Sequence, residues 1–316
     1  MSSASNDQGR AFEYACIITL EINIKNYRPV FIDTDSTEAA KRAWNTQSKS
    51  QQDTLLKAAD AFVDTLFKAE PLILEQDQSN DVLVLSILKD SDAEKGDVRD
   101  IIILRDSINW KIGLSMKHNH FAVKHSRLSR TIDFGNKWYG LPCSSSYWNA
   151  VIPIFERLGR SKNIAWKDMR NKAQDIYIPL LQAFSKEFLR AYKTNGAVLK
   201  NMFSYLLGIH DFYKVVAIDS KSLTEFQTFN LHGELNKNGK HRKATLVVPL
   251  AKLPDEIVCL RFKPNSSNTI ELYCNNGWAL SFRIHNASTM VEPSLKFDIQ
   301  FMGIPSNILT INCIWR

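Results

Sequence analysis

The hydrophobic pattern of the chain changes period within the first 120 residues, and this change constrains the fold more than any other feature. Apolar residues recur at helical spacing over 9–25 and again over 37–69. Three short β-branched or apolar runs follow, separated by turn-like segments. These runs are 82–88, 98–105 and 110–117. Sequential strands with short links predict an antiparallel meander, preceded here by two helical regions.

The rest of the chain continues with helices and then becomes mostly strand. A short helix is expected at 120–130, and helical patterns return at 146–158 and 172–207. The strand-like runs beyond them are 212–218, 244–250, 257–263, 269–274, 278–285 and 295–301. We therefore predict an α/β (α+β) protein with a core over 1–207 and a β-rich region over 208–316 packed on it.

Composition narrows the class of protein. With 316 residues, 44% hydrophobic and 23% charged, the chain is typical of a globular protein and unlike a disordered or coiled-coil one. Its apolar runs are too short to cross a bilayer, and its N-terminus has no signal-peptide pattern. Five scattered cysteines without a C-x-x-C pair argue against a disulfide framework or a zinc ribbon. A reducing, cytoplasmic location is expected.

Charge is unevenly distributed along the sequence. The formal net charge is +7, but residues 1–106 sum to −7 and residues 107–316 to +14. A strongly basic two-thirds of a chain attracts polyanions, of which nucleic acid is the first candidate, although a solvated lysine-rich surface gives the same count.

Asp100 and Lys117 are the first candidate catalytic pair. Asp100 precedes one apolar strand and Lys117 ends the next, so a tight hairpin brings them to one end of the sheet. Side chains alternate along a strand, so Gly113, Ser115 and Lys117 share a face. A carboxylate that holds Mg²⁺ beside a lysine that positions water or stabilises the phosphorane is suited to phosphodiester cleavage. Taken alone, an isolated pair of this spacing is more often a turn cap and a solvated strand end.

A basic block around Lys117 favours the functional interpretation. Residues 111–130 contain five Lys or Arg, three of the seven histidines and no acid. A helix after the catalytic strand, with Lys124, Arg127 and Ser129, is expected to hold phosphates on both sides of a scissile bond.

Five motifs resemble the HaeIII-type family of type II restriction endonucleases. They lie at 7–13, 96–100, 113–120, 124–129 and 277–287, so the resemblance covers nearly the whole chain. It implies a restriction-endonuclease-like core of the PD-(D/E)XK type, with a central mixed sheet flanked by helices. It further implies Mg²⁺-dependent cleavage of double-stranded DNA, at GGCC with blunt ends, and a cognate DNA methyltransferase encoded with the enzyme.

One position departs from the superfamily pattern. The residue two before Lys117, normally Asp or Glu, is Ser115, and a hydroxyl is a poor ligand for a hard cation. Glu13, on the first predicted helix, is the candidate for the missing carboxylate, because a helical Glu before the sheet often faces the metal in this superfamily. Asp97 competes with Asp100 but is expected to face the opposite side of the strand.

Other polar residues are candidates for DNA contact. His118-Asn119-His120 only coincides in letters with His-Asn-His nucleases, and no further ligand stands at metal spacing, so DNA contact is the better interpretation. Arg283 is a candidate reader of guanine, although an ordinary arginine on an edge strand explains it equally well. The remaining candidates are Arg10, Ser115, Lys240, Arg242, His285 and Asn286. Two aromatic pairs, Trp138-Tyr139 and Tyr147-Trp148, are expected in the core rather than against bases.

Three functions remain open from the sequence. The first is a Mg²⁺-dependent restriction endonuclease, acting as a monomer or a C₂ homodimer. The second is a DNA-binding protein on the same fold that lost catalysis with its second carboxylate. The third is a structure-specific or RNA-directed nuclease.

Overall fold

The computed structural model describes residues 4–76, 81–88 and 96–316. The chain forms two compact units, each described here by itself. The first unit comprises residues 1–121, 208–251 and 306–316; the second comprises 122–207 and 252–305. These units do not follow the single boundary at 207, and the predicted division into a catalytic and a recognition region stays a prediction about function.

The first unit contains a seven-stranded mixed sheet in the order β1-β2-β3-β4-β6-β7-β12. Its strands are β1 (Val30–Ile32), β2 (Leu83–Ile87), β3 (Ile101–Arg105), β4 (Trp110–His118), β6 (Phe212–Ile218), β7 (Leu223–Phe229) and β12 (Thr310–Ile314). Strands β2, β3 and β4 pair antiparallel, which confirms the predicted meander. Strand β6 pairs parallel to β4, and residues 119–211 form the long connection that parallel neighbours require.

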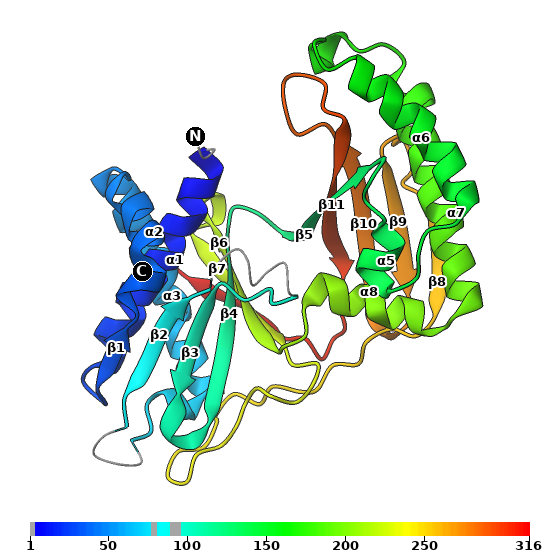
Figure 1. Cartoon of the computed structure of the whole chain (residues 1–316). Helices are drawn as coiled ribbons and strands as arrows, with labels where there is room; N and C mark the ends of the chain where they lie inside the picture. Colours follow the sequence, from blue (N-terminus) through cyan, green and yellow to red (C-terminus); the bar gives the residue numbers. More distant parts are fainter. Residues whose placement is uncertain (1–3, 77–80, 89–95) are drawn as a thin grey trace. The chain divides into compact units, whose positions relative to one another are not determined.

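Three helices accompany this sheet: α1 (Ala4–Ile24), α2 (Thr34–Asn45) and α3 (Lys49–Ala69) (Figure 1). Helix α3 begins with a capping box in which Ser48 and Gln51 satisfy each other's backbone N–H groups. Its apolar stripe and that of α1 pack on one face of the sheet, with Leu114, Met116 and Tyr213 among the strand residues of this core. The residues that alternate with them, including Ser115, Lys117 and Lys214, therefore face the other side.

The second unit contains a five-stranded antiparallel sheet in the order β5-β11-β10-β9-β8, accompanied by helices (Figure 1). The strands are β5 (Ala122–Ser129), β8 (Ile257–Phe262), β9 (Thr269–Cys274), β10 (Ala279–His285) and β11 (Ser294–Gly303). The helices are α5 (Phe134–Tyr139), α6 (Ser145–Arg160), α7 (Ile178–Thr194) and α8 (Ala197–Leu207). Trp138, Tyr139 and Tyr147 are buried, as predicted, whereas Trp148 of the second pair is only partly buried.

The α+β class is confirmed, and several local predictions are wrong. The helix expected at 120–130 is wrong: this segment contains strand β5, because Ala122, Ser126 and Leu128 alternate into the core while β5 pairs with β11. Residues 244–250 form no strand: their backbone bonds to the end of α3 and to the side chains of residues 236 and 238. Strands β1, β7 and β12 were not predicted. Among the described helices, none is long and apolar enough to cross a membrane.

Candidate active site

Asp100 and Lys117 meet at the end of the β3–β4 hairpin. Lys117 Nζ lies 3.0 Å from Asp100 Oδ2 and also donates to the carbonyl of Met116 at 2.9 Å. The two side chains are 26% and 27% exposed, so they are accessible to a substrate while held by the sheet. The predicted convergence of a carboxylate and an amine is therefore present in the structure.

The position of Ser115 gives its hydroxyl a defined role. Ser115 Oγ lies 3.3 Å from Asp100 Oδ2, and the Met116 N–H donates to the same oxygen at 2.6 Å. Together with Lys117, these donors hold one carboxylate oxygen from three directions. At the position where the resemblance implied a second carboxylate, this chain has a hydrogen-bond donor to the first.

Asp97 is engaged elsewhere. Its Oδ1 accepts from the Arg99 backbone N–H at 3.1 Å and from Nε at 2.8 Å, and its Oδ2 accepts from Nη2 at 2.6 Å. Burial raises the pKa of Asp97, but these bonds and the guanidinium charge outweigh it and hold the pKa below its ordinary value. Both carboxylate oxygens serve Arg99, and a metal role for Asp97 stays a prediction.

Glu13 lies on α1, partly buried. Its neighbour Phe12 is in the core, with its ring 6.0 Å from that of His118. Among the described residues, no group of three or more His, Cys, Asp or Glu is arranged to hold a metal ion. Mg²⁺ commonly takes one or two protein carboxylates and completes its shell with water and phosphate oxygens, so Asp100, with or without Glu13, fits that ion.

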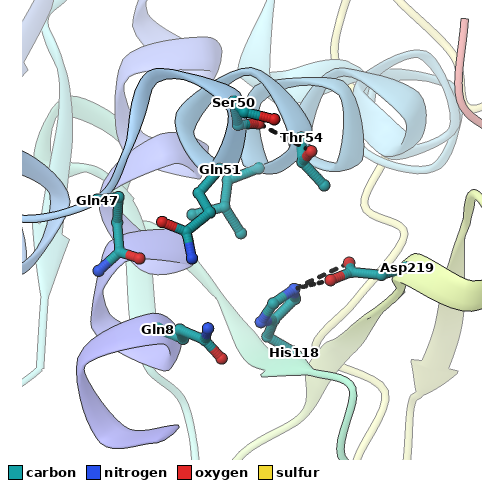
Figure 2. A pocket seen from close by; sticks show the side chains of 8 residues that line it. Gln8, Gln47, Ser50, Gln51, Thr54, His118 and Asp219 are labelled. Carbon is teal, nitrogen blue, oxygen red and sulfur yellow. Dashed lines mark hydrogen bonds and ion pairs between the residues drawn. The ribbon is translucent and has the colours of Figure 1, made fainter. Parts of the chain in front are cut away.

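The end of β4 is tied to the end of β6 through Asp219. His118 Nε2 lies 2.9 and 3.0 Å from the two carboxylate oxygens of Asp219. Asn119 donates to Asp219 Oδ2 at 2.9 Å and accepts from its backbone N–H at 3.0 Å. His118 and Asp219 border a pocket of about 130 Å³ (Figure 2). Its other lining residues are Gln8, Gln47, Ser50, Gln51, Thr54 and Leu55. The predicted DNA contacts of His118, Asn119 and the half-buried His120 stay predictions, and the structure adds Asp219 as the anchor of His118 and Asn119.

A lysine that was not among the predicted site residues lies beside Ser115. Lys214 is on β6 directly opposite Ser115 in the parallel register, and it is only 5% exposed. Burial and then the charge of Lys117 lower the pKa of Lys214 to about 8, while Glu225 opposes the shift. The available signal was a single lysine in the otherwise apolar run 212–218.

The basic loop at 236–243 is held by backbone hydrogen bonds to one acidic side chain. The buried carboxylate of Glu75 accepts from the backbone N–H groups of Lys240 at 2.8 Å, His241 at 3.3 Å and Arg242 at 2.8 Å. The Arg242 guanidinium also lies 5.5 Å from the ring of Tyr27. The structure thus shows how the loop is fixed, while phosphate contact by Lys240 and Arg242 stays a prediction, as does that of the partly buried Arg10.

In the second unit, two candidates lie on strand β5. Lys124 Nζ donates to the carbonyl of Tyr205 at 2.9 Å and lies 3.9 Å from the centre of its ring. Burial, and then the charge of Lys137, lowers the pKa of Lys124 to about 8. Arg127 donates to Ser294 Oγ at 2.7 Å and keeps 40% of its side chain exposed. Arg127 is therefore better presented for phosphate contact than Lys124.

The C-terminal candidates differ in exposure. Arg283 on β10 bonds Asp298 on β11 at 3.0 Å, with 53% of its side chain exposed. His285 Nδ1 is buried and lacks a hydrogen-bond partner among the described residues, and burial lowers the pKa of His285. Asn286 bonds the backbone of Ser288, Met290 and Glu292, which is the pattern of a turn-forming residue.

The positive charge belongs mainly to the second unit. Its 19 Lys and Arg stand against 10 Asp and Glu, a net charge of +9, which leaves 21 against 23 and −2 for the first unit. A unit of this charge is suited to hold a polyanion, whereas the Asp100–Lys117 pair belongs to the other, nearly neutral unit.

Comparison with known proteins gives matches over nearly the whole chain, as the five motifs did. Residues 9–305 match the HaeIII restriction endonuclease family. Over 320 residues the chain is 47% identical to the type II restriction enzyme HaeIII of Haemophilus aegyptius, with 100% of both chains covered. No solved structure matches it. The resemblance of the five motifs is confirmed, and the chain belongs to the HaeIII restriction endonuclease family.

Proposed function

We propose that the protein is a type II restriction endonuclease that hydrolyses phosphodiester bonds of double-stranded DNA in the presence of Mg²⁺. The observation that carries the proposal is the 3.0 Å contact between Lys117 and Asp100 on adjacent strands, within a chain that matches its family from residue 9 to 305. Cleavage at GGCC with blunt ends, a cytoplasmic location and a cognate methyltransferase are part of the proposal by relationship to HaeIII.

Each residue of the site has a proposed task. Asp100 and Glu13 would hold the metal ion, which supplies a Lewis acid for the phosphate and lowers the pKa of the attacking water. Ser115 and the Met116 N–H keep the Asp100 carboxylate oriented. The Lys117 ammonium positions water or stabilises negative charge on the phosphorane.

The predicted DNA contacts fall into two groups in this proposal. Arg127 and the loop residues Lys240 and Arg242 are proposed to contact phosphates, which fix the register of the protein on DNA. Arg283, whose side chain is 53% exposed and whose Nη2 bonds Asp298, is proposed to read guanine. Its fixed guanidinium is suited to bidentate pairing, and this supports Arg283 over the buried Asn286.

Cleavage of plasmid DNA of known sequence tests the proposal. With Mg²⁺ the wild-type protein is expected to give discrete fragments that end within GGCC. Asp100→Ala and Lys117→Ala are each expected to lower the cleavage rate by more than about 100-fold. Both variants should still bind the duplex in Ca²⁺, because phosphate contacts lie elsewhere. Glu13→Gln is expected to resemble Asp100→Ala and to be relieved partly by excess Mg²⁺.

Asp106→Asn is the matched control, because Asp106 is an exposed carboxylate at the other end of the same hairpin. Its cleavage rate should equal that of the wild type. Near-normal turnover by the Lys117 variant contradicts the assignment of that lysine. A shifted band without any cleavage by the wild-type protein supports the non-catalytic DNA-binding protein, the alternative that Ser115 favours.

A further inference from the structure

We propose that Lys214 is a positioning residue of the cleavage site, which fixes the end of the catalytic strand β4 and adds a second positive charge beside Lys117. The inference rests on the proposed function and extends it to a residue outside the family motifs noted above. The inference rests on the register of strands β3, β4, β6 and β7. It also rests on two buried polar side chains in these strands, Lys214 and Gln227.

Lys214 lies in one polar row with the catalytic residues. Ser115 pairs with Lys214 across β4 and β6, and Lys214 pairs with Gln227 across β6 and β7. On the other side, Ser115 Oγ bonds Asp100 at the head of β3. Paired residues of neighbouring strands share a face, so a row of four polar side chains crosses the sheet opposite the core packed by α1 and α3.

The packing of β6 does not require an amine at this position. Every residue of β6 is buried, and its other side chains are apolar or aromatic. A buried ammonium is costly to desolvate, and an apolar side chain of similar length would fill the strand without that cost. Residues that break a local rule of this kind are expected at functional sites.

Gln227 gives an independent sign that this row is built for polar chemistry. Its Oε1 is buried and has no hydrogen-bond partner among the described residues. Such an acceptor is uncommon in folded proteins and calls for a specific explanation, such as a bound water or ion. Its register partner is Lys214, so the interior of the row holds both a cation and an unsatisfied acceptor next to the Asp100–Lys117 pair.

The contacts of Lys214 define what it positions. Its Nζ donates to the carbonyl of Phe121 at 3.2 Å. Phe121 is four residues beyond Lys117 and is the last residue of the first unit before the chain enters the second. Lys214 thus fastens the segment that leaves the catalytic strand, from the strand that is its parallel neighbour.

Its charge faces a small set of groups. Lys117 on β4 and Glu225 on β7 both act on it electrostatically, and His120 lies on the 119–121 segment that it fastens. With a pKa of about 8, Lys214 loses its proton within the range in which cleavage is measured. The charged form donates to Phe121 and adds a positive charge beside Lys117 at the site of cleavage, so cleavage should fall as pH rises through about 8.

Two substitutions at Lys214 and one control test the inference. Lys214→Met keeps the length of the side chain without its charge, and Lys214→Arg keeps a charge that does not titrate in this range. Lys111→Met is the control, because Lys111 is exposed on the same face of β4. Thermal unfolding, duplex binding in Ca²⁺ and single-turnover cleavage from pH 6.5 to about 9.5 are measured for each protein.

Lys214→Met is expected to unfold at or above the wild-type temperature and to bind duplex normally, yet to cleave about 10- to 100-fold more slowly and without a decline near pH 8. Lys214→Arg should recover most of the rate and keep it at high pH. If Lys214→Met does not fold, the pH profile of Lys214→Arg decides alone: a decline like that of the wild type overturns the inference.

Before the Lys214 variants are compared, the wild-type protein must cleave the same DNA and Asp100→Ala must not. If the wild-type protein does not cleave, or if Asp100→Ala cleaves as well, the proposed function is contradicted. A Lys214→Met rate within twofold of the wild type, with cleavage otherwise intact, overturns only the role of Lys214.

Discussion

At the scale of single residues, the two aspartates near the head of β3 show how local contacts separate similar side chains. Asp100 is held through one oxygen by donors from the neighbouring strand. Asp97 is held through both oxygens by a side chain two residues away. The first arrangement keeps a carboxylate at the exposed edge of the catalytic hairpin, whereas the second neutralises a guanidinium that is almost fully buried.

Asp97→Asn is therefore expected to affect stability more than catalysis. The Arg99 side chain is 4% exposed, and the loss of its carboxylate partner should lower the free energy of unfolding by about 2–3 kcal/mol at pH 7. Because the pKa of Asp97 is lowered by folding, this contribution is present above the ordinary pKa and is lost as pH falls through the lowered value. Urea unfolding at pH 7 and pH 3 measures it.

Mg²⁺-dependent cleavage should persist in Asp97→Asn once the protein is folded, whereas Asp100→Asn should lose it. Loss of cleavage without loss of stability in the Asp97 variant would show that Asp97 is the metal ligand after all.

At the scale of elements, the β3–β4 hairpin depends on a glycine that leaves room for Arg99. A Cβ at Gly113 would overlap the aliphatic carbons of the Arg99 side chain, which the hairpin holds against β4. Lys117 follows four residues later on the same face of the strand, so any adjustment at 113 is transmitted to the catalytic edge.

Gly113→Ala is expected to lower stability by about 1–3 kcal/mol and to reduce cleavage, since Arg99 or the strand must move. Gly159→Ala is the control: Gly159 lies inside α6 with nothing within 4 Å of its Cβ position, and alanine is the better helix former there by about 0.5–1 kcal/mol. Thermal unfolding of both variants, followed by cleavage assays, checks the pair. Equal stabilities would contradict the packing argument.

The sequence predicted elements whose periodicity is local and missed those defined by distant partners. Helices α1, α3 and α6 and strands β2 to β4 have apolar patterns that are complete within the segment. Strand β5, by contrast, owes its conformation to β11, more than 160 residues away, so its basic sequence indicated a helix. The same distinction applies to the site. The Asp100–Lys117 contact follows from a short hairpin, whereas Lys214 on β6 and Asp219 just after β6 follow the 86-residue segment 122–207 of the second unit.

At the scale of the whole molecule, a buried acid makes stability depend on pH. Glu70, at the end of α3, is fully buried, with its Oε1 accepting from Tyr213 Oη and the Asn236 N–H at 2.5 Å each. Burial raises the pKa of Glu70 to about 7 against the lowering effect of these bonds. The protonated form is therefore favoured by folding, and stability is lost as pH rises from the ordinary value toward and through 7.

Glu70→Gln is expected to remove this dependence. Relative to the variant, the wild-type protein should lose on the order of 2–3 kcal/mol of unfolding free energy between pH 5 and pH 8. Urea unfolding across that range measures the difference. Glu38→Gln, at an exposed helix position, should show no such trend. Parallel pH profiles for wild type and Glu70→Gln would contradict the assignment.

The parallel pairing of β4 with β6 has a consequence for how the molecule is made. Between His118 and Phe212 lies the sequence of β5 and four helices of the second unit, so β4 is an open edge of the sheet until β6 is synthesised. At about 5–20 residues per second, this interval lasts several seconds on the ribosome. During this interval Lys214 and Asp219 have not yet been synthesised. Lys117 can then contact Asp100 but not Lys214, and the hydrogen bonds between Asn119 and Asp219 have not formed. In the nascent chain of this DNA-cleaving protein, β6 would therefore pair with the catalytic strand β4 late in synthesis, after most of the basic residues have been made.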